Sequence, residues 1–242
     1  MKKSQIITVL VMATVNITAH AQFTEINLSS LINADLQTYT DGTDYQPGGS
    51  QLTVSGVPFG LALLNNTPGT TGIVQTPDNG GQIQSYTFSI PAGTYATILY
   101  TLMNTTWGYA GVNEGSIVVT GSGGETATLD LTEGFNIRDH YNGFYCNTYT
   151  DPTLVPTYFV NQAPNPTNGQ VRLDRQELVL PSSFDGDTLA SITFNGIGHG
   201  QFSGGDPFLA AMTLQTVPEP GLFSLFGLAA LVLVIRRQRR SR

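Results

Sequence analysis

Apolar residues at every second position, in short runs separated by turn-forming residues, limit the folds open to this chain more than any other feature. Tyr86, Phe88 and Ile90 alternate with Ser and Thr. Further apolar runs lie at 95–103, 117–119, 129–131, 171–173, 178–180, 190–194 and 208–214. Clusters such as Pro47-Gly48-Gly49 and Asp78-Asn79-Gly80-Gly81 stand between the runs. Short strands with regular turns predict an all-β fold, an antiparallel sandwich or barrel.

The alternation also predicts which side chains are buried. In the run 95–103, Ala96, Ile98, Tyr100 and Leu102 share one side, and Thr97 and Thr101 occupy the other. We expect four core residues from this pattern: Ile98, Tyr100, Ile192 and Phe194. Residues 27–36 are the single weak helix candidate, so we expect less than about a tenth of the body in helix.

The N-terminus has the features of an export signal. Lys2 and Lys3 form a basic start, an apolar stretch begins at Ile6, and Ala19-His20-Ala21 is an A-x-A cleavage site. Residues 1–21 are therefore predicted to be removed, which makes Gln22 the first residue of the mature chain.

The C-terminus has three parts in a fixed order. Pro218-Glu219-Pro220 precedes an apolar run, 222–235, and five arginines follow from Arg236 to Arg242. The run is shorter than the roughly 20 residues that span a bilayer comfortably, and the arginines favour a cytoplasmic end. This order resembles the PEP-CTERM sorting signal, which implies an exosortase as partner, transient inner-membrane insertion and release at the cell surface. A plain single-pass anchor would explain the apolar run and the arginines but not Pro218, Glu219 and Pro220.

These assignments give three segments: a signal peptide at 1–21, a β-sandwich domain at 22–216 and a sorting segment at 217–242. The middle segment contains three arginines, no lysine and sixteen of the seventeen acidic residues, which gives a formal charge of −13. Such a charge repels nucleic acid and anionic lipid headgroups, so we exclude both as partners.

Cys146 is the only cysteine. An intramolecular disulfide is therefore excluded, and this exported domain must be stabilised by its core. The thiol is either buried, as is usual for a free cysteine, or available for pairing with another molecule.

The order of features from Gln51 to Asp139 carries a second resemblance. Gly56-Val57-Pro58-Phe59 comes first, Ile90-Pro91-Ala92-Gly93 leads into an apolar run, and Gly134-Phe135-Asn136-Ile137 closes the series. This series resembles the galactose-binding-like β-sandwich (jelly-roll) domains of exported glycan-active proteins. The resemblance implies a sandwich that binds carbohydrate, although the loop at 104–109 is longer than the pattern.

The most polar constellation lies directly after a predicted strand. Residues 136–143 contain a guanidinium, a carboxylate, an imidazole and two carboxamides, and the single tryptophan lies in an earlier loop. An arginine fork can hold sugar hydroxyls or a carboxylate, and an indole face can stack on a sugar ring. The predicted ligand site, on one accessible edge, consists of Trp107, Asn136, Arg138, Asp139, His140 and Tyr141. The alternative is structural: Arg138 pairs with Asp139 or another carboxylate and pins a long loop.

Catalytic and metal motifs are missing from the sequence. The chain has no G-x-S-x-G, H-E-x-x-H or EF-hand pattern, and only His140 and His199 remain after the signal. A glycosidase pair would have to come from Glu114, Glu125, Asp130, Glu133 or Asp139. Calcium held by Asp41 and Asp44, or by Asp185 and Asp187, is the one cofactor hypothesis, although such segments are usually turns.

Together these observations predict an exported, non-catalytic surface or matrix protein whose sandwich binds glycan such as exopolysaccharide. The first alternative is a structural matrix component that needs no defined pocket. The second alternative is an extracellular hydrolase.

Overall fold

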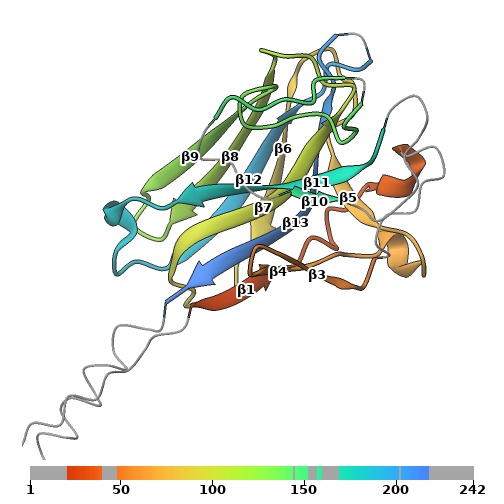
Figure 1. The fold of residues 1–242 in the computed structure, drawn as a ribbon. Coiled ribbons are helices and arrows are strands. Elements are labelled where there is room, and N and C mark those ends of the chain that lie inside the picture. Colours follow the sequence, from red (N-terminus) through yellow and green to blue (C-terminus); the bar gives the residue numbers. More distant parts are fainter. Residues whose placement is uncertain are drawn as a thin grey trace, which may run out of the picture.

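The computed structural model describes residues 21–39, 48–143, 145–151, 157–159, 169–201 and 203–217. The predicted export signal, apart from Ala21, and the sorting segment after Val217 lie outside the described residues. The described part of the chain is all-β, with antiparallel pairing between its strands (Figure 1).

Four strands form the smaller sheet, in the order β6–β12–β8–β9. Their bounds are Ile83–Ser89 for β6, Leu189–Ile197 for β12, Asn113–Gly121 for β8 and Thr126–Thr132 for β9. Each strand contains or overlaps one of the predicted apolar runs. The inward-facing residues Phe88 of β6, Ile117 of β8 and Phe194 of β12 are at most 2% exposed.

The larger sheet has seven strands, in the order β10–β11–β7–β13–β5–β2, with β1 also paired to β13. The strands are β1 Gln22–Ile26, β2 Ala34–Asp35, β5 Gly72–Gln75, β7 Ala96–Thr106, β10 Thr157–Phe159, β11 Arg172–Val179 and β13 Asp206–Thr216. The runs 171–173 and 178–180, which looked like two strands, belong mostly to the single strand β11.

Both faces of β7 are covered. Leu99 and Met103 pack between the two sheets with Ile192 and Phe194. Tyr100 and Leu102 point the other way, into a second core closed by the hairpin of β3 (Gln51–Val54) and β4 (Val57–Gly60). The hairpin adds a third layer, which buries Tyr100 and Leu102. Thr101, predicted on the opposite side from Tyr100, is buried as well, because it shares the face of Leu99 and Met103 that the smaller sheet covers.

The predicted core residues are largely confirmed. Tyr100, Ile192 and Phe194 are at most 6% exposed, whereas Ile98 is only partly buried against the second core. Ala96 belongs to the core between the sheets rather than to the second core, because the β7–β13 register shifts beside it.

The expectation of little helix is confirmed for the described residues, which contain no α-helix and three short 3-10 helices at Leu36–Tyr39, Leu64–Asn66 and Ser182–Phe184. The helix candidate at 27–36 is wrong. Asn27 accepts the Ser29 N–H, and the Asn33 amide both donates to and accepts from the main chain of Gln75. Such bonds between Asn side chains and the main chain compete with helix.

The two ends of the domain lie side by side. In the β1–β13 ladder Gln22 is opposite Thr216, so the start of β1 and the end of β13 are neighbours (Figure 1). At the other end of β13, Asp206 is opposite Thr106 of β7. Loops 107–112, 133–143 and 198–205 gather there, and we call this the loop end of the sandwich.

Phe59→Ala tests the third layer. Phe59 is fully buried in the second core, so its truncation should reduce the free energy of unfolding of the mature chain by about 3–5 kcal/mol. Urea denaturation measures the loss. The control is Ile83→Ala, whose side chain is 66% exposed and should cost under about 0.5 kcal/mol. Equal losses in the two variants would show that the hairpin does not close a core.

Candidate functional site

Residues 136–141, which carry most of the predicted ligand site, extend the larger sheet at the loop end of the sandwich. Asp139 forms a parallel bridge with Thr105, just before the end of β7, and Tyr141 bridges Val171, just before β11. The His140 N–H donates to the Thr105 carbonyl, and the Arg172 N–H donates to the His140 carbonyl. The loop therefore lies between the ends of β7 and β11, bonded to both.

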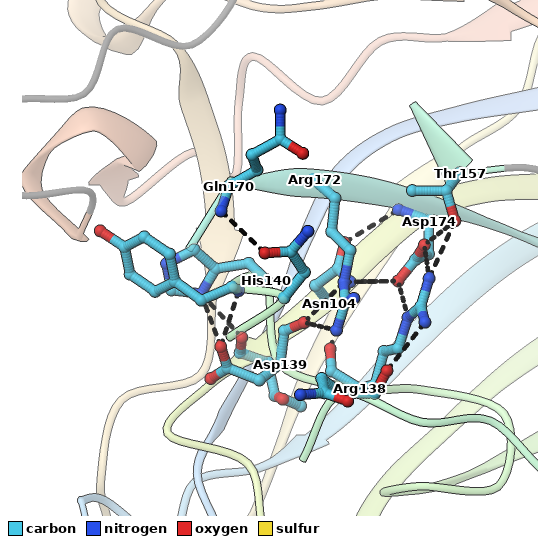
Figure 2. A network of polar contacts seen from close by, with 12 residues as sticks. Asn104, Arg138, Asp139, His140, Thr157, Gln170, Arg172 and Asp174 are labelled. Carbon is cyan, nitrogen blue, oxygen red and sulfur yellow. Dashed lines mark hydrogen bonds and ion pairs between the residues drawn. The ribbon is translucent and has the colours of Figure 1, made fainter. Parts of the chain in front are cut away.

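Asp174 of β11 is the centre of the polar contacts in Figure 2. Arg138 donates to both carboxylate oxygens, Nε to Oδ2 at 2.8 Å and Nη2 to Oδ1 at 2.9 Å. Thr157 Oγ1 donates to Oδ1 at 2.7 Å, and Asn104 Nδ2 donates to Oδ2 at 2.6 Å. We call these residues, with Arg172, the Asp174 network.

Burial alone would raise the pKa of Asp174, which has no exposed surface. The hydrogen bonds and charge of Arg138, and then the charge of Arg172, hold that pKa below its usual value instead. Asp174 is therefore a carboxylate whose charge is balanced within the protein.

Arg138 ties a second loop to this centre. Its Nη1 donates to the Asn147 carbonyl at 2.9 Å, and its guanidinium lies 4.0 Å from the centre of the Tyr149 ring. Arg172 donates from Nε and Nη2 to the Asp139 carbonyl, at 3.1 and 2.9 Å. The third arginine of the domain, Arg175, lies over the Tyr100 ring at 4.7 Å and is 8% exposed.

The accessible edge expected from these side chains is not found. Asn136, Asp139, His140 and Tyr141 are at most 4% exposed, and the Arg138 side chain is 13% exposed. The Asp139 carboxylate accepts the N–H groups of Tyr141 and Gly108, at 2.7 and 3.3 Å. The structural alternative is therefore confirmed for Arg138, with Asp174 rather than Asp139 as its carboxylate partner.

Trp107 lies beside this loop but is half-buried. Its backbone has a φ of 60°, a left-handed conformation that bulky residues seldom adopt, where the chain turns out of β7. The next residue, Gly108, donates to Asp139 and accepts the Cys146 N–H through its carbonyl. The structure thus brings the Trp107 loop and the 136–141 loop together, as contacts within the fold.

An open pocket of about 390 Å³ lies at the same end, and we call it the tyrosine pocket. It is lined by Gly108, Tyr109, Ala110, Tyr145, Cys146, Asn147 and Thr148. The Tyr109 and Tyr145 rings meet edge to face, with centroids 6.4 Å apart, and Tyr109 is 41% exposed. Sequence reasoning could not separate Tyr145 from Tyr149, because only the folded loop places Tyr145 in a pocket wall and Tyr149 against Arg138.

Cys146 is a half-buried free thiol in the wall of this pocket. Burial, followed by the charge of Glu133, raises the pKa of the thiol. A thiol with a raised pKa is a weaker nucleophile at neutral pH, which favours a packing role for Cys146.

The catalytic candidates are poorly placed for a substrate. Glu114, Glu133 and Asp139 do lie near one another at the loop end, but each is at most 1% exposed. Asp130 is exposed on the outer side of β9, and Glu125 lies at the opposite end, before β9 begins. No two of these five acids therefore flank an open cleft in the described structure.

Within the described ranges, no group of three or more His, Cys, Asp or Glu side chains is arranged to hold a metal ion. Asp185 follows the 3-10 helix Ser182–Phe184, and its N–H donates to the Ser182 carbonyl, as in an ordinary turn. The other proposed calcium ligands, Asp41 and Asp44, lie outside the described residues.

Comparison with known proteins identifies the C-terminus. Residues 216–240 match the PEP-CTERM protein-sorting motif. No curated protein and no solved structure matches the chain. The motif implies an exported protein that is processed by an exosortase and sorted to the cell surface. In the part of the chain that the structure describes, no helix has the length and apolar character needed to cross a membrane.

Asp174→Asn tests the network that fixes the loop. The substitution leaves Arg138 without its buried counter-charge, so we expect the free energy of unfolding to fall by about 3–5 kcal/mol. Asp130→Asn makes the same change of charge at an exposed position and should cost under about 0.5 kcal/mol. Urea denaturation of both variants at pH 7 measures the difference, and similar small losses would contradict a structural role for the Asp174 network.

Proposed function

We propose that this chain is a non-catalytic surface protein whose β-sandwich binds a neutral glycan in the tyrosine pocket. The observation that carries the proposal is an open pocket walled by two tyrosine rings, at the end of the domain opposite the paired residues Gln22 and Thr216. The likeness of residues 51–139 to galactose-binding-like domains supports a carbohydrate as the ligand class.

The chemistry of the pocket suits a sugar. Tyrosine rings offer apolar faces for the C–H side of a pyranose and hydroxyl groups for hydrogen bonds. The Asn147 carboxamide and the Thr148 hydroxyl add polar groups that can fix orientation, and the volume lies within the usual range for small-ligand sites.

The charge distribution favours a neutral ligand over an acidic one. Arg138 and Arg172 are bound within the Asp174 network, and Arg175 lies against Tyr100. The remaining ionisable groups of the domain are mostly acidic, since its formal charge is −13 from three arginines and sixteen acids. Uronic or sialic acids would meet repulsion without a compensating cation.

The placement of the pocket suits display at a surface. Gln22 and Thr216 are adjacent at one end of the sandwich, and the tyrosine pocket lies at the other. The strand that leads to the sorting segment, β13, therefore ends at the opposite end of the sandwich from the pocket.

A structural matrix component is the second candidate, favoured by the outer face of the smaller sheet. Three rows of paired residues cross its four strands: Ser89–Ser191–Thr120–Thr126, Thr87–Thr193–Val118–Thr128 and Ser85–Asn195–Ser116–Asp130. All of them are at least partly exposed, and Asp130 is the only charged residue in the rows. Such a hydroxyl-rich face can associate with polymer or with other chains without a pocket.

Glycan binding by the mature chain distinguishes the two candidates. On an array of neutral and acidic glycans, Tyr109→Ala and Tyr145→Ala should each weaken binding to a neutral glycan by roughly 1–3 kcal/mol. The matched control is the double variant Thr87→Ala/Thr193→Ala on the outer sheet face. If this control loses binding and the tyrosine variants retain it, the sheet face is the contact surface and the pocket proposal is wrong.

The mature surface form should lack the arginine tail. The apolar run 222–235 is short for a permanent anchor and follows Pro218-Glu219-Pro220 within the matched motif. Intact-mass measurement of the protein recovered from the cell surface should show a chain that begins at Gln22 and ends before Arg236. Recovery of a surface form that retains Arg242 would contradict exosortase processing.

A further inference from the structure

Two glutamates lie inside the sandwich at the loop end. Glu133 follows β9 and continues its inward-facing row after Ala127 and Leu131. Glu114 is the extra residue of a β-bulge in β8, between Asn113, which pairs with Thr132, and Gly115, which pairs with Leu131. A bulge redirects the side chain of its extra residue, and here it turns Glu114 into the interior beside Glu133.

Three of the four carboxylate oxygens of this pair have no donor. Glu114 is 0% exposed, and neither Oε1 nor Oε2 has a hydrogen-bond partner among the described residues. Glu133 is 1% exposed; its Oε2 accepts from Thr105 Oγ1 at 2.9 Å, whereas its Oε1 has no described partner. Buried polar groups are nearly always bonded, so these oxygens require an explanation.

Neighbouring carboxylates make the burial of Glu114 and Glu133 less favourable. Asp206 is a further acidic neighbour of Glu114, and Asp139 is a further acidic neighbour of Glu133. Arg172 is near Glu133, but its guanidinium is engaged with the Asp139 carbonyl and with Asp174.

We propose that Glu114 and Glu133 bind a calcium ion between the two sheets. A divalent cation neutralises the negative charges of the two carboxylates, and the three unpartnered oxygens can act as its ligands. The donors are oxygen atoms, which suit Ca²⁺, and Ca²⁺ completes its six to eight ligands with main-chain carbonyls and water. Two carboxylates with neutral oxygens also differ from the His- and Cys-rich groups that transition metals prefer.

This site goes beyond the proposed glycan function and supports the same end of the domain. The Glu133 main chain bonds the loop before β8: its carbonyl accepts the Gly111 N–H, and its N–H donates to the Val112 carbonyl. Its Oε1 lies so close to Gly108 that a Cβ there would be 1.9 Å away. Gly108 lines the tyrosine pocket, so the ion braces the pocket wall from inside.

Calcium binding by the full chain tests the proposal. The protein is purified in detergent, stripped with EDTA and titrated with Ca²⁺ or Mg²⁺ by calorimetry. We expect one Ca²⁺ per chain, weaker binding of Mg²⁺, and a melting temperature raised by about 5–10 °C at 100 times the dissociation constant. Glu114→Gln and Glu133→Gln should each lower the Ca²⁺ affinity at least 100-fold, whereas Asp130→Asn should leave it unchanged.

Two results would overturn the proposal. Unchanged Ca²⁺ affinity in both glutamine variants would place the ion elsewhere, for example at Asp185 and Asp187. A wild-type chain that binds no Ca²⁺, with Glu114→Gln melting above it, would show that the two glutamates are simply protonated. Native mass spectrometry of the wild type gives the metal content even where a variant does not fold. Glycan binding is measured separately, so failure of the pocket proposal leaves this test intact.

Discussion

The buried carboxylate of Asp174 determines how the loop end of this domain is built. It receives Arg138 from the 136–143 loop, Asn104 from β7 and Thr157 from β10, and it lies itself on β11. Four segments far apart in the sequence are fixed to one charged group. Because an unbalanced buried charge is costly, these segments must all be in place before the arrangement is stable. The tyrosine pocket depends on this, since Arg138 also holds the 147–149 segment that leads into its wall.

The surface of the domain is acidic because its three arginines are engaged in contacts within the fold. Arg138 and Arg172 surround Asp174, Arg175 lies on Tyr100, and most carboxylates have no arginine available to them. Buried positions for Glu114 and Glu133 are then unusual, since both could be solvated at no cost on a strand's outer face. The β-bulge in β8 turns Glu114 inward. Bulges of this kind recur next to functional sites.

The sequence predicted the regular parts of this structure better than the site. Alternation such as Tyr86, Phe88 and Ile90 located the strands of the smaller sheet, because one face of that sheet is buried and the other is solvated. It did not reveal that β7 is covered on both faces, since the covering hairpin comes from residues 51–60. The sequence suggested the loop-pinning pair of Arg138 only as an alternative to a ligand site and could not name its partner, because Asp174 lies 36 positions away and only the β7–β11 pairing brings it there. The tyrosine pocket depends on the packing of two irregular loops, for which no periodic pattern exists.

The β13 ladder has a mechanical consequence. β13 is the strand that continues into the sorting segment, and it is hydrogen-bonded to β7 along one edge and to β1 along the other. Tension applied through Val217, along the strand, loads both rows of hydrogen bonds together rather than one bond at a time. Separation would then require sliding β13 between its neighbours. A domain pulled through the end of β13 is therefore held by two ladders of hydrogen bonds instead of one.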